Sequence, residues 1–167
     1  ESNQIINSTI IELDIPDLEA LRFESVFKNN DGDLFLDFEY RKLDQEEFTS
    51  VFGKLNEDGT ALSTLKEINN TLRDSPLITE ENVIVVAGEE SINGVENCKI
   101  TYLDQNLNTL DSRVIVHEGD QKPINIILLP NGKIQLFGTH NCCNSSLIRF
   151  SAHHLDRNAV KEQRRCR

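Results

Sequence analysis

The sequence predicts an α+β fold: a mainly antiparallel β-sheet of hairpins and a meander, with two amphipathic helices around residues 44–74 packed on it. Three observations lead to this prediction. Apolar and polar residues alternate before residue 41 and again from residue 83. Between these regions the apolar spacing changes to that of a helix. Turn sequences rich in Asn, Asp and Gly separate the strand-like segments.

The N-terminal part predicts a strand followed by a hairpin. Residues 9–15 alternate apolar and acidic side chains and stop at Pro16, which predicts a strand. Residues 21–27 and 34–40 alternate in the same way around the turn sequence at 29–33, where Asp31-Gly32 can supply positive φ angles.

The middle part predicts the two helices. Residues 44–55 begin with a capping Asp44 and continue with an apolar stripe at helical spacing: Phe48, Val51, Phe52 and Leu55. Residues 56–59 break this helix. Residues 60–73 carry a second stripe, formed by Leu62, Leu65, Ile68 and Leu72, and Ser75-Pro76 ends it.

The remaining sequence predicts an antiparallel meander. Its strands are expected at residues 83–87, 99–103, 114–117, 124–129, 133–137 and 147–150, with a hairpin turn at Pro130-Asn131-Gly132. We expect a single acidic domain over residues 1–151, followed by a basic tail or short helix over 152–167. No internal repeat is evident.

The charge is strongly acidic and unevenly distributed. The formal net charge is −11, yet residues 149–167 carry six Lys/Arg against two Asp/Glu. An acidic body repels nucleic acid and anionic membranes, so we expect neither as a partner. It can attract a basic protein partner, or the charge can simply keep the protein soluble. No segment is long and apolar enough to predict a membrane span.

The four cysteines and four histidines all lie in the last 70 residues. Disulfides are the leading interpretation for Cys98, Cys142, Cys143 and Cys166. A bond between the neighbouring Cys142 and Cys143 would be strained, so Cys98 and Cys166 would each pair with one of them, in either order.

Two other interpretations of these residues stay open. A zinc site would draw its ligands from His140, Cys142, Cys143, His153, His154 and Cys166, although no Cys-x2-Cys pair is present. A reactive thiol would use Cys142 or Cys143, with His140 or His153 as the base and Asp156 to orient it.

Other site signals are weak or absent. Asn7, Asn69 and Asn144 begin glycosylation sequons. The acidic stretches around Gly32 and Gly59 lack the first and twelfth ligands of an EF-hand loop, so we predict turns there rather than calcium sites. Standard catalytic signatures are missing, and we assign no catalytic residue and no cofactor.

Residues 94–104, Gly-Val-Glu-Asn-Cys-Lys-Ile-Thr-Tyr-Leu-Asp, resemble a strand of the minor pseudopilins of type II secretion and type IV pilus systems. The resemblance implies a small, extracytoplasmic, β-rich subunit, often stapled by a disulfide. The family carries a long N-terminal helix before its sheet, whereas residues 9–15 predict a strand here.

These observations together predict a non-catalytic, secreted or extracytoplasmic domain that binds or assembles through an acidic surface. A minor pseudopilin-like subunit is one alternative. The other is an intracellular protein with a Cys/His zinc site or a reactive thiol.

Overall fold

The computed structural model describes residues 10–140, except 12, 69–75, 117 and 118, together with the backbone of 147–153 and 160–163. The chain divides into two compact units, Glu1–Glu67 and Ile68–Arg167. The described residues form antiparallel sheets and contain no helix, so the predicted α+β class is wrong and the fold is all-β. No helical segment in this described part has the length and apolar character to cross a membrane.

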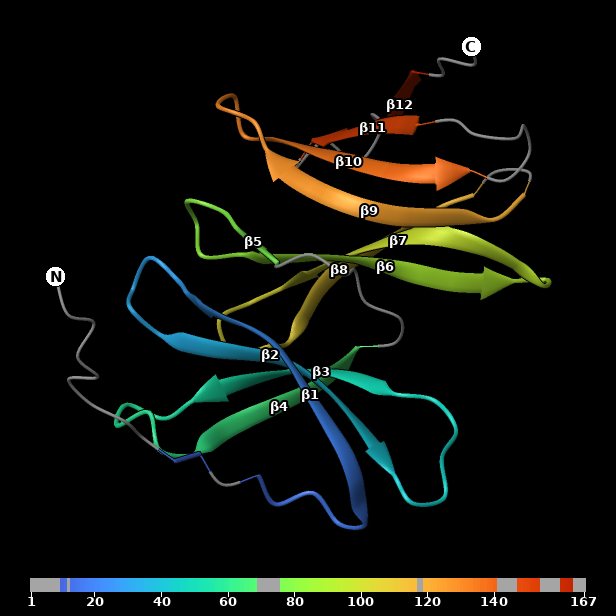
Figure 1. The fold of residues 1–167 in the computed structure, drawn as a ribbon. Helices are drawn as coiled ribbons and strands as arrows, with labels where there is room; N and C mark the ends of the chain where they lie inside the picture. The colour runs from blue at the N-terminus through green and yellow to red at the C-terminus, as the bar shows by residue number, and fades with distance from the viewer. Residues whose placement is uncertain are drawn as a thin grey trace, which may run out of the picture. The chain divides into compact units, whose positions relative to one another are not determined.

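The first unit contains one four-stranded sheet in the order β1-β2-β3-β4 (Figure 1). Its strands follow one another along the chain: β1 (Leu18–Lys28), β2 (Leu34–Lys42), β3 (Thr49–Leu55) and β4 (Leu62–Ile68). The hairpin predicted from residues 21–27 and 34–40 is confirmed as β1 and β2, which pair antiparallel.

One face of this sheet carries the hydrophobic core of the first unit. Its buried members are Leu36, Phe38, Tyr40, Val51 and Leu55. The segment before β1 packs on this core through Ile11, Leu13 and Ile15. The apolar residues of the segment 9–15 therefore pack on the core as a set. The described residues of this segment do not form the predicted strand.

The second unit contains two four-stranded sheets. The first has the order β5-β6-β7-β8 and consists of β5 (Leu77–Ile78), β6 (Ile84–Ile92), β7 (Val95–Leu103) and β8 (Thr109–Ile115). The second has the order β12-β11-β10-β9 and consists of β9 (Gln121–Leu128), β10 (Lys133–His140), β11 (Leu147–His153) and β12 (Val160–Gln163). The segment 152–167, predicted as a basic tail or short helix, thus contributes β12.

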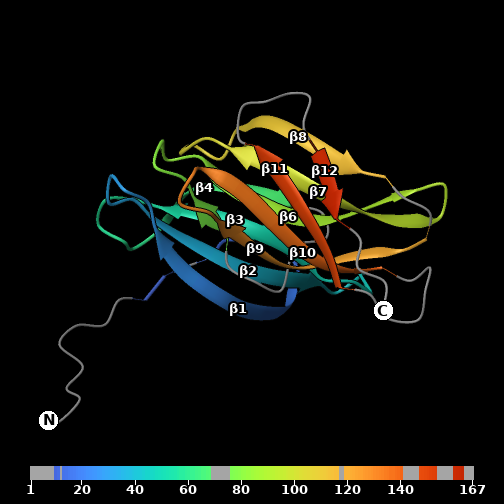
Figure 2. The ribbon, with the colours of Figure 1, turned by 90° about the horizontal axis from the view of Figure 1, so that it is seen from above.

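The two sheets of the second unit lie face to face as a sandwich (Figures 1 and 2). Val85, Ala87, Cys98, Ile100, Tyr102 and Ile115 project from the β5–β8 sheet into one core with Ile126, Ile134 and Leu136 of the β9–β12 sheet. Burying these apolar side chains is the main favourable term that holds the two sheets together.

The helix predicted over residues 44–55 is wrong, because its second half is strand β3. Phe38 lies opposite Val51 and Tyr40 lies opposite Thr49 in the β2–β3 ladder. The expected stripe is divided between two sheet faces: Val51 joins the core, while Phe52 makes an edge-to-face contact with Phe27. The β-branched residues of Thr49–Leu55 and its Gly53 are poor helix formers, so pairing with β2 prevails over the helical spacing.

The helix predicted over residues 60–73 is also wrong in its described part, which contains β4. Leu62 packs beside Gly53, where an added Cβ would collide with the Leu62 side chain. The burial of β4 alternates residue by residue between half-buried and exposed, as in a strand with one covered face. Leu62, Leu65 and Ile68 fit helical spacing. Pairing with the edge of β3 nevertheless makes this segment a strand.

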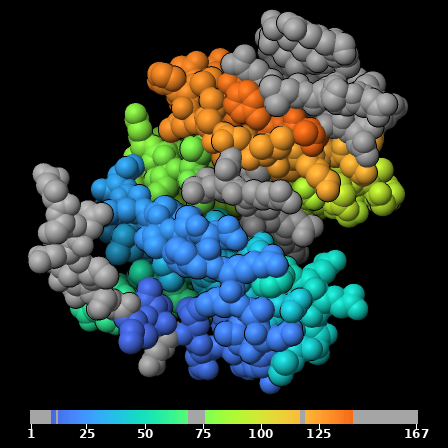
Figure 3. All heavy atoms as spheres, in the orientation of Figure 1, coloured from blue at the N-terminus to red at the C-terminus, as the bar shows by residue number. Residues whose placement is uncertain are grey.

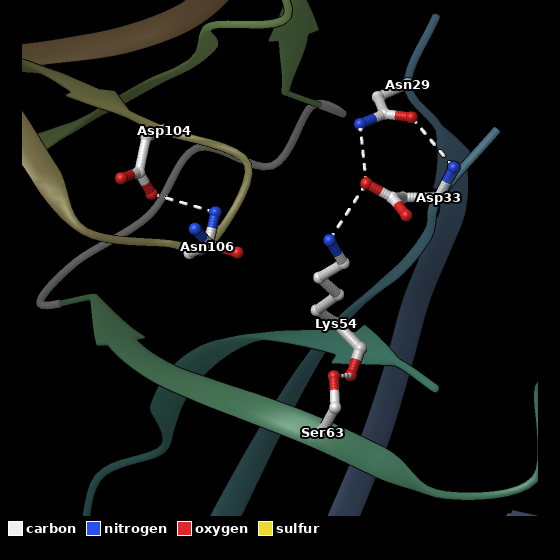
Figure 4. Close-up of polar contacts among 6 residues, drawn as sticks. All are labelled: Asn29, Asp33, Lys54, Ser63, Asp104 and Asn106. Atoms are coloured by element: carbon white, nitrogen blue, oxygen red, sulfur yellow. Dashed lines mark hydrogen bonds and ion pairs between the residues drawn. The ribbon is translucent and has the colours of Figure 1, made fainter. Parts of the chain in front are cut away.

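Five hairpins share one turn geometry. In each, the N–H of the fourth turn residue donates to the carbonyl of the first, and the fourth residue has positive φ: Gly32, Gly59, Asn82, Leu107 and Gly132. In four of them the oxygen of the first side chain also accepts a backbone N–H; these first residues are Asn29, Asn56, Thr79 and Asp104. Figure 4 shows the contact of Asn29 with Asp33 and, at Asp104, a second bond, which this side chain also accepts from the Asn106 N–H. The predicted turns around Gly32 and Gly59 are therefore confirmed.

The shared turns reveal a repeat of 50 residues that is not evident from the sequence. Asn29, Thr79 and Leu129 begin the first turn of the three successive sheets, and they are spaced 50 residues apart. Each sheet is a four-stranded antiparallel meander in chain order. The repeat escapes inspection because the three turns have different side chains, Asn-Asn-Asp-Gly, Thr-Glu-Glu-Asn and Leu-Pro-Asn-Gly.

Candidate binding cleft

A cleft of about 680 Å³ opens in the second unit between the first turns of its two sheets. The β5–β6 turn forms one lip and the β9–β10 turn forms the other. The lining residues are Thr79, Glu80, Glu81, Leu128, Leu129, Pro130, Asn131 and Gly132. The repeat thus places two equivalent turns, 50 residues apart in the chain, on either side of one cavity.

Local hydrogen bonds hold both lips in shape. On the first lip, the Val83 N–H donates to Thr79 Oγ1 at 3.1 Å and the Thr79 N–H donates to the Val83 carbonyl at 3.0 Å. On the second, the Leu129 N–H donates to the Lys133 carbonyl at 2.8 Å. The Lys133 N–H donates to Asn131 Oδ1 at 3.2 Å, which orients that side-chain amide. A cleft between two such turns is largely preformed before any ligand arrives.

The two lips differ in chemistry. Glu80 and Glu81 are exposed and place two carboxylates at the first lip. Leu128 and Leu129 are half-buried and give the second lip an apolar wall. This pairing suits a ligand that carries a positive group beside an apolar one. The residues that line the cleft include no Cys, His or Ser.

Cys98 lies in the core of the sandwich and not at any surface. It sits on β7, has no solvent exposure and carries a free thiol in this structure. Burial, and secondarily the charge of Glu89, raises the pKa of the Cys98 thiol to about 12. The thiol is therefore protonated at neutral pH and behaves as a small apolar side chain. The disulfide predicted for Cys98 is not observed.

The other predicted Cys and His sites are only partly described. Cys142, Cys143, Cys166 and His154 lie outside the described residues, as do Asp156 and the sequon residues Asn7, Asn69 and Asn144. Their pairing, ligation or modification stays a prediction. In the described part of the chain, no group of three His, Cys, Asp or Glu residues is placed to hold a metal ion.

His140 and His153 lie at opposite ends of the β10–β11 pair. His153 is opposite Lys133, the first residue of β10, whereas His140 is the last. Seven residues of extended strand separate these positions, a backbone distance of about 23 Å. The structure therefore keeps the backbone positions of His140 and His153 apart, while the zinc site as a whole stays a prediction.

Asp37 is a buried carboxyl group that sequence reasoning missed. Asp37 lies between Leu36 and Phe38 in an alternating pattern, which predicts that its side chain faces water. In the structure Asp37 is only 5% exposed. Burial, together with the charges of Glu24 and Glu39, raises the pKa of Asp37 to about 7. Phe35 was the sequence signal that this face is buried, because residues 35 and 37 project from the same side of β2.

The segment that resembles minor pseudopilins forms the β6–β7 turn and strand β7. Asn93 and Gly94 form a two-residue turn with positive φ at both positions, and Ile92 pairs with Val95. β7 is an inner strand of a four-stranded meander. The long helix that the family carries before its sheet has no counterpart among the described residues.

No protein-family model matches the chain, and comparison with curated proteins and with solved structures found no significant match.

Proposed function

We propose that this protein is a non-catalytic binding domain whose cleft between the β5–β6 and β9–β10 turns takes a basic, partly apolar segment of a protein partner. The observation that carries the proposal is the pairing of two carboxylates, Glu80 and Glu81, with the apolar wall of Leu128 and Leu129 in one cavity. The net charge of −11 supports it, because an acidic protein steers a basic partner toward encounter.

The proposed chemistry accounts for the two halves of the ligand separately. A lysine or arginine head group near the Glu80 and Glu81 carboxylates gains an electrostatic attraction that salt weakens. A leucine or similar side chain of the ligand would pack against Leu128 and Leu129 and bury apolar surface. Salt does not weaken this hydrophobic contribution to binding. Binding should therefore fall with ionic strength but should not vanish at high salt.

A short peptide of alternating lysine and leucine tests the cleft. We expect its addition to shift the backbone amide NMR signals of residues 79–82 and 128–132. The double variant Glu80→Lys/Glu81→Lys should lower the affinity at least tenfold. Glu57→Lys/Asp58→Lys is the matched control, since it reverses two exposed acids in a turn of the same geometry. Equal loss in both variants, or shifts spread over the whole chain, would show general attraction between opposite charges and sink the cleft proposal.

The extracytoplasmic location is a further part of the proposal and rests on the cysteines. With Cys98 free and buried, the disulfide candidates that remain are Cys142, Cys143 and Cys166. Intact mass of protein purified without added thiol should show a loss of hydrogens that reductant restores. A native mass carrying one zinc, with all thiols free after denaturation, would favour the intracellular alternative.

A further inference from the structure

Asn93 and Gly94 form the tip of the β6–β7 hairpin and are open to solvent. Both residues are exposed, and a Cβ added at Gly94 would meet no atom within 4 Å. They make a two-residue turn with positive φ at both positions, flanked by the pair of Ile92 and Val95. Figure 3 shows the end of this hairpin, in yellow-green, at the surface of the molecule. Water therefore reaches this dipeptide.

The chain contains four dipeptides in which Asn or Asp precedes glycine, and the hydrogen bonds of the turns separate Asn93-Gly94 from the rest. The Gly94 N–H makes no hydrogen bond to another described residue. In the other three dipeptides the glycine N–H donates to the carbonyl of the first turn residue: Gly32 to Asn29 at 3.2 Å, Gly59 to Asn56 at 2.9 Å and Gly132 to Leu129 at 2.9 Å.

A solvated glycine N–H can take part in the loss of ammonia from an asparagine that precedes it. The amide nitrogen gives its proton to hydroxide and forms a bond to the asparagine Cγ; the Cγ–Nδ2 bond breaks, and Nδ2 takes up a proton and leaves as ammonia. Water then opens the five-membered ring at either carbonyl, which yields aspartate or isoaspartate. The attack is favoured because both reacting groups belong to neighbouring residues and glycine has no side chain in the way.

We propose that Asn93 is a site of spontaneous deamidation in the folded protein, and that the turn geometry protects the second Asn-Gly dipeptide, Asn131-Gly132, from the same reaction. A hydrogen-bonded N–H must open before it loses its proton, as in amide hydrogen exchange. The Gly132 N–H must leave the Leu129 carbonyl, and Asn131 Oδ1 must release the Lys133 N–H, which lies at 3.2 Å. No described residue restrains Asn93 in this way. This inference does not depend on the binding function.

An isoaspartate at position 93 loosens this end of the hairpin. Its main chain is one carbon longer, so a two-residue turn no longer matches the pairing of Ile92 with Val95. The next residue, Glu96, ties β7 to the β8–β9 connection, because its N–H donates to Asp120 Oδ1 at 3.1 Å. We expect the isoaspartate form to melt about 2–4 °C below the unmodified protein. The cleft lies at the other end of β6 and should keep its affinity.

Peptide mass mapping of the full chain during incubation at pH 8 measures both sites in one sample, since each deamidation adds about 1 Da. In the folded protein the peptide containing Asn93 should convert at least fivefold faster than the peptide containing Asn131. Opening one hydrogen bond in the Asn131 turn shifts a local equilibrium by about that factor. In urea neither turn is formed, and the two rates should approach each other because the dipeptides are the same.

Asn93→Gln and Asn131→Gln are the matched variants, because a glutamine side chain must close a larger ring and reacts more slowly. Asn93→Gln should remove the main acidic species that ion-exchange chromatography detects during incubation, whereas Asn131→Gln should leave it. A thermal melt establishes that each variant is folded. Equal rates at the two sites of the folded protein, faster conversion at Asn131, a rate difference that persists in urea, or an Asn93 peptide that stays unmodified while the unfolded chain converts overturns the proposal.

Discussion

Lys54 Nζ lies 2.8 Å from Asp33 Oδ2 and ties strand β3 to the end of the β1–β2 turn (Figure 4). The same Asp33 oxygen accepts a hydrogen bond from Asn29 Nδ2 at 3.0 Å, and the Asp33 N–H donates to Asn29 Oδ1 at 2.8 Å. One carboxylate thus joins the turn to the neighbouring strand. The hydrogen bond from Lys54 is the main reason that the pKa of Asp33 lies below its ordinary value of 3.8.

Replacing Lys54 by Met should lower the free energy of unfolding by about 1 kcal/mol at pH 7, as for a partly exposed, well-aligned ion pair. Because the pKa of Asp33 is lowered in the folded state, this contribution is present above pH 3.8 and is lost as the pH falls through the folded value. Urea unfolding of the Lys54→Met variant and the unmodified protein at pH 7 and pH 2.5 measures the loss of stability and its dependence on pH. A difference between the two proteins that is unchanged at pH 2.5 would contradict the assignment.

Asp37→Asn should stabilise the protein at pH 8 by about 1–2 kcal/mol and have much less effect at pH 4. The pKa of Asp37 is raised to about 7 in the folded state, so its favourable contribution is complete below the unfolded value near 4. That contribution is lost as the pH rises through about 7. Thermal melts across this range test the sign, with the exposed turn residue Asp58→Asn as a control. A benefit that grows toward acid pH would contradict this account.

Gly138→Ala should destabilise the second unit by about 2 kcal/mol. Gly138 lies opposite Pro123 at an irregularity in the β9–β10 ladder, and a Cβ there would stand 2.6 Å from the Lys122 carbonyl oxygen. Gly94→Ala is the comparison, since it has no neighbouring atom within 4 Å and positive φ is its only penalty, about 1 kcal/mol. Denaturant unfolding should rank Gly138→Ala as the more damaging change; the reverse order would show that the ladder relaxes around an added methyl group.

Cys98 should resist alkylation in the folded protein and react fully after unfolding. The side chain has no solvent exposure, and burial raises the pKa of its thiol to about 12. Iodoacetamide treatment at pH 8, followed by peptide mass mapping, measures its modification separately from the other cysteines. Rapid labelling of Cys98 under native conditions would show that the sandwich opens locally, and a Cys98 disulfide in the map would restore the prediction made from the sequence.

Local chemistry made the hairpins predictable. Asp31-Gly32 and Asn131-Gly132 supply positive φ within four-residue turns, and alternation on either side is enough to recognise β1, β2 and most of β10. The stripe of Phe48, Val51, Phe52 and Leu55 misled the assignment because i, i+3, i+4, i+7 spacing also places residues on both faces of a strand buried on two sides. Only pairing with β2 separates the two conformations.

The candidate cleft could not be foreseen, although one of its two lips was visible in the sequence. The sequence shows Pro130-Asn131-Gly132 as a turn, but nothing local indicates that Thr79–Asn82 adopts the same geometry or lies beside it. The clustered Cys and His residues were the strongest local signal for a site in the sequence. In the structure, however, the β10–β11 register separates His140 from His153.

The sequence by itself determined the turns that contain glycine, the alternation of most strands and the acidic charge, because these depend on the φ preferences and side-chain types of neighbouring residues. The tertiary structure decided that β3 and β4 are strands, that Cys98 and Asp37 are buried, and that two turns 50 residues apart enclose a cleft. These features depend on ladder hydrogen bonds and sheet packing between residues distant in the chain, and no local propensity encodes such contacts.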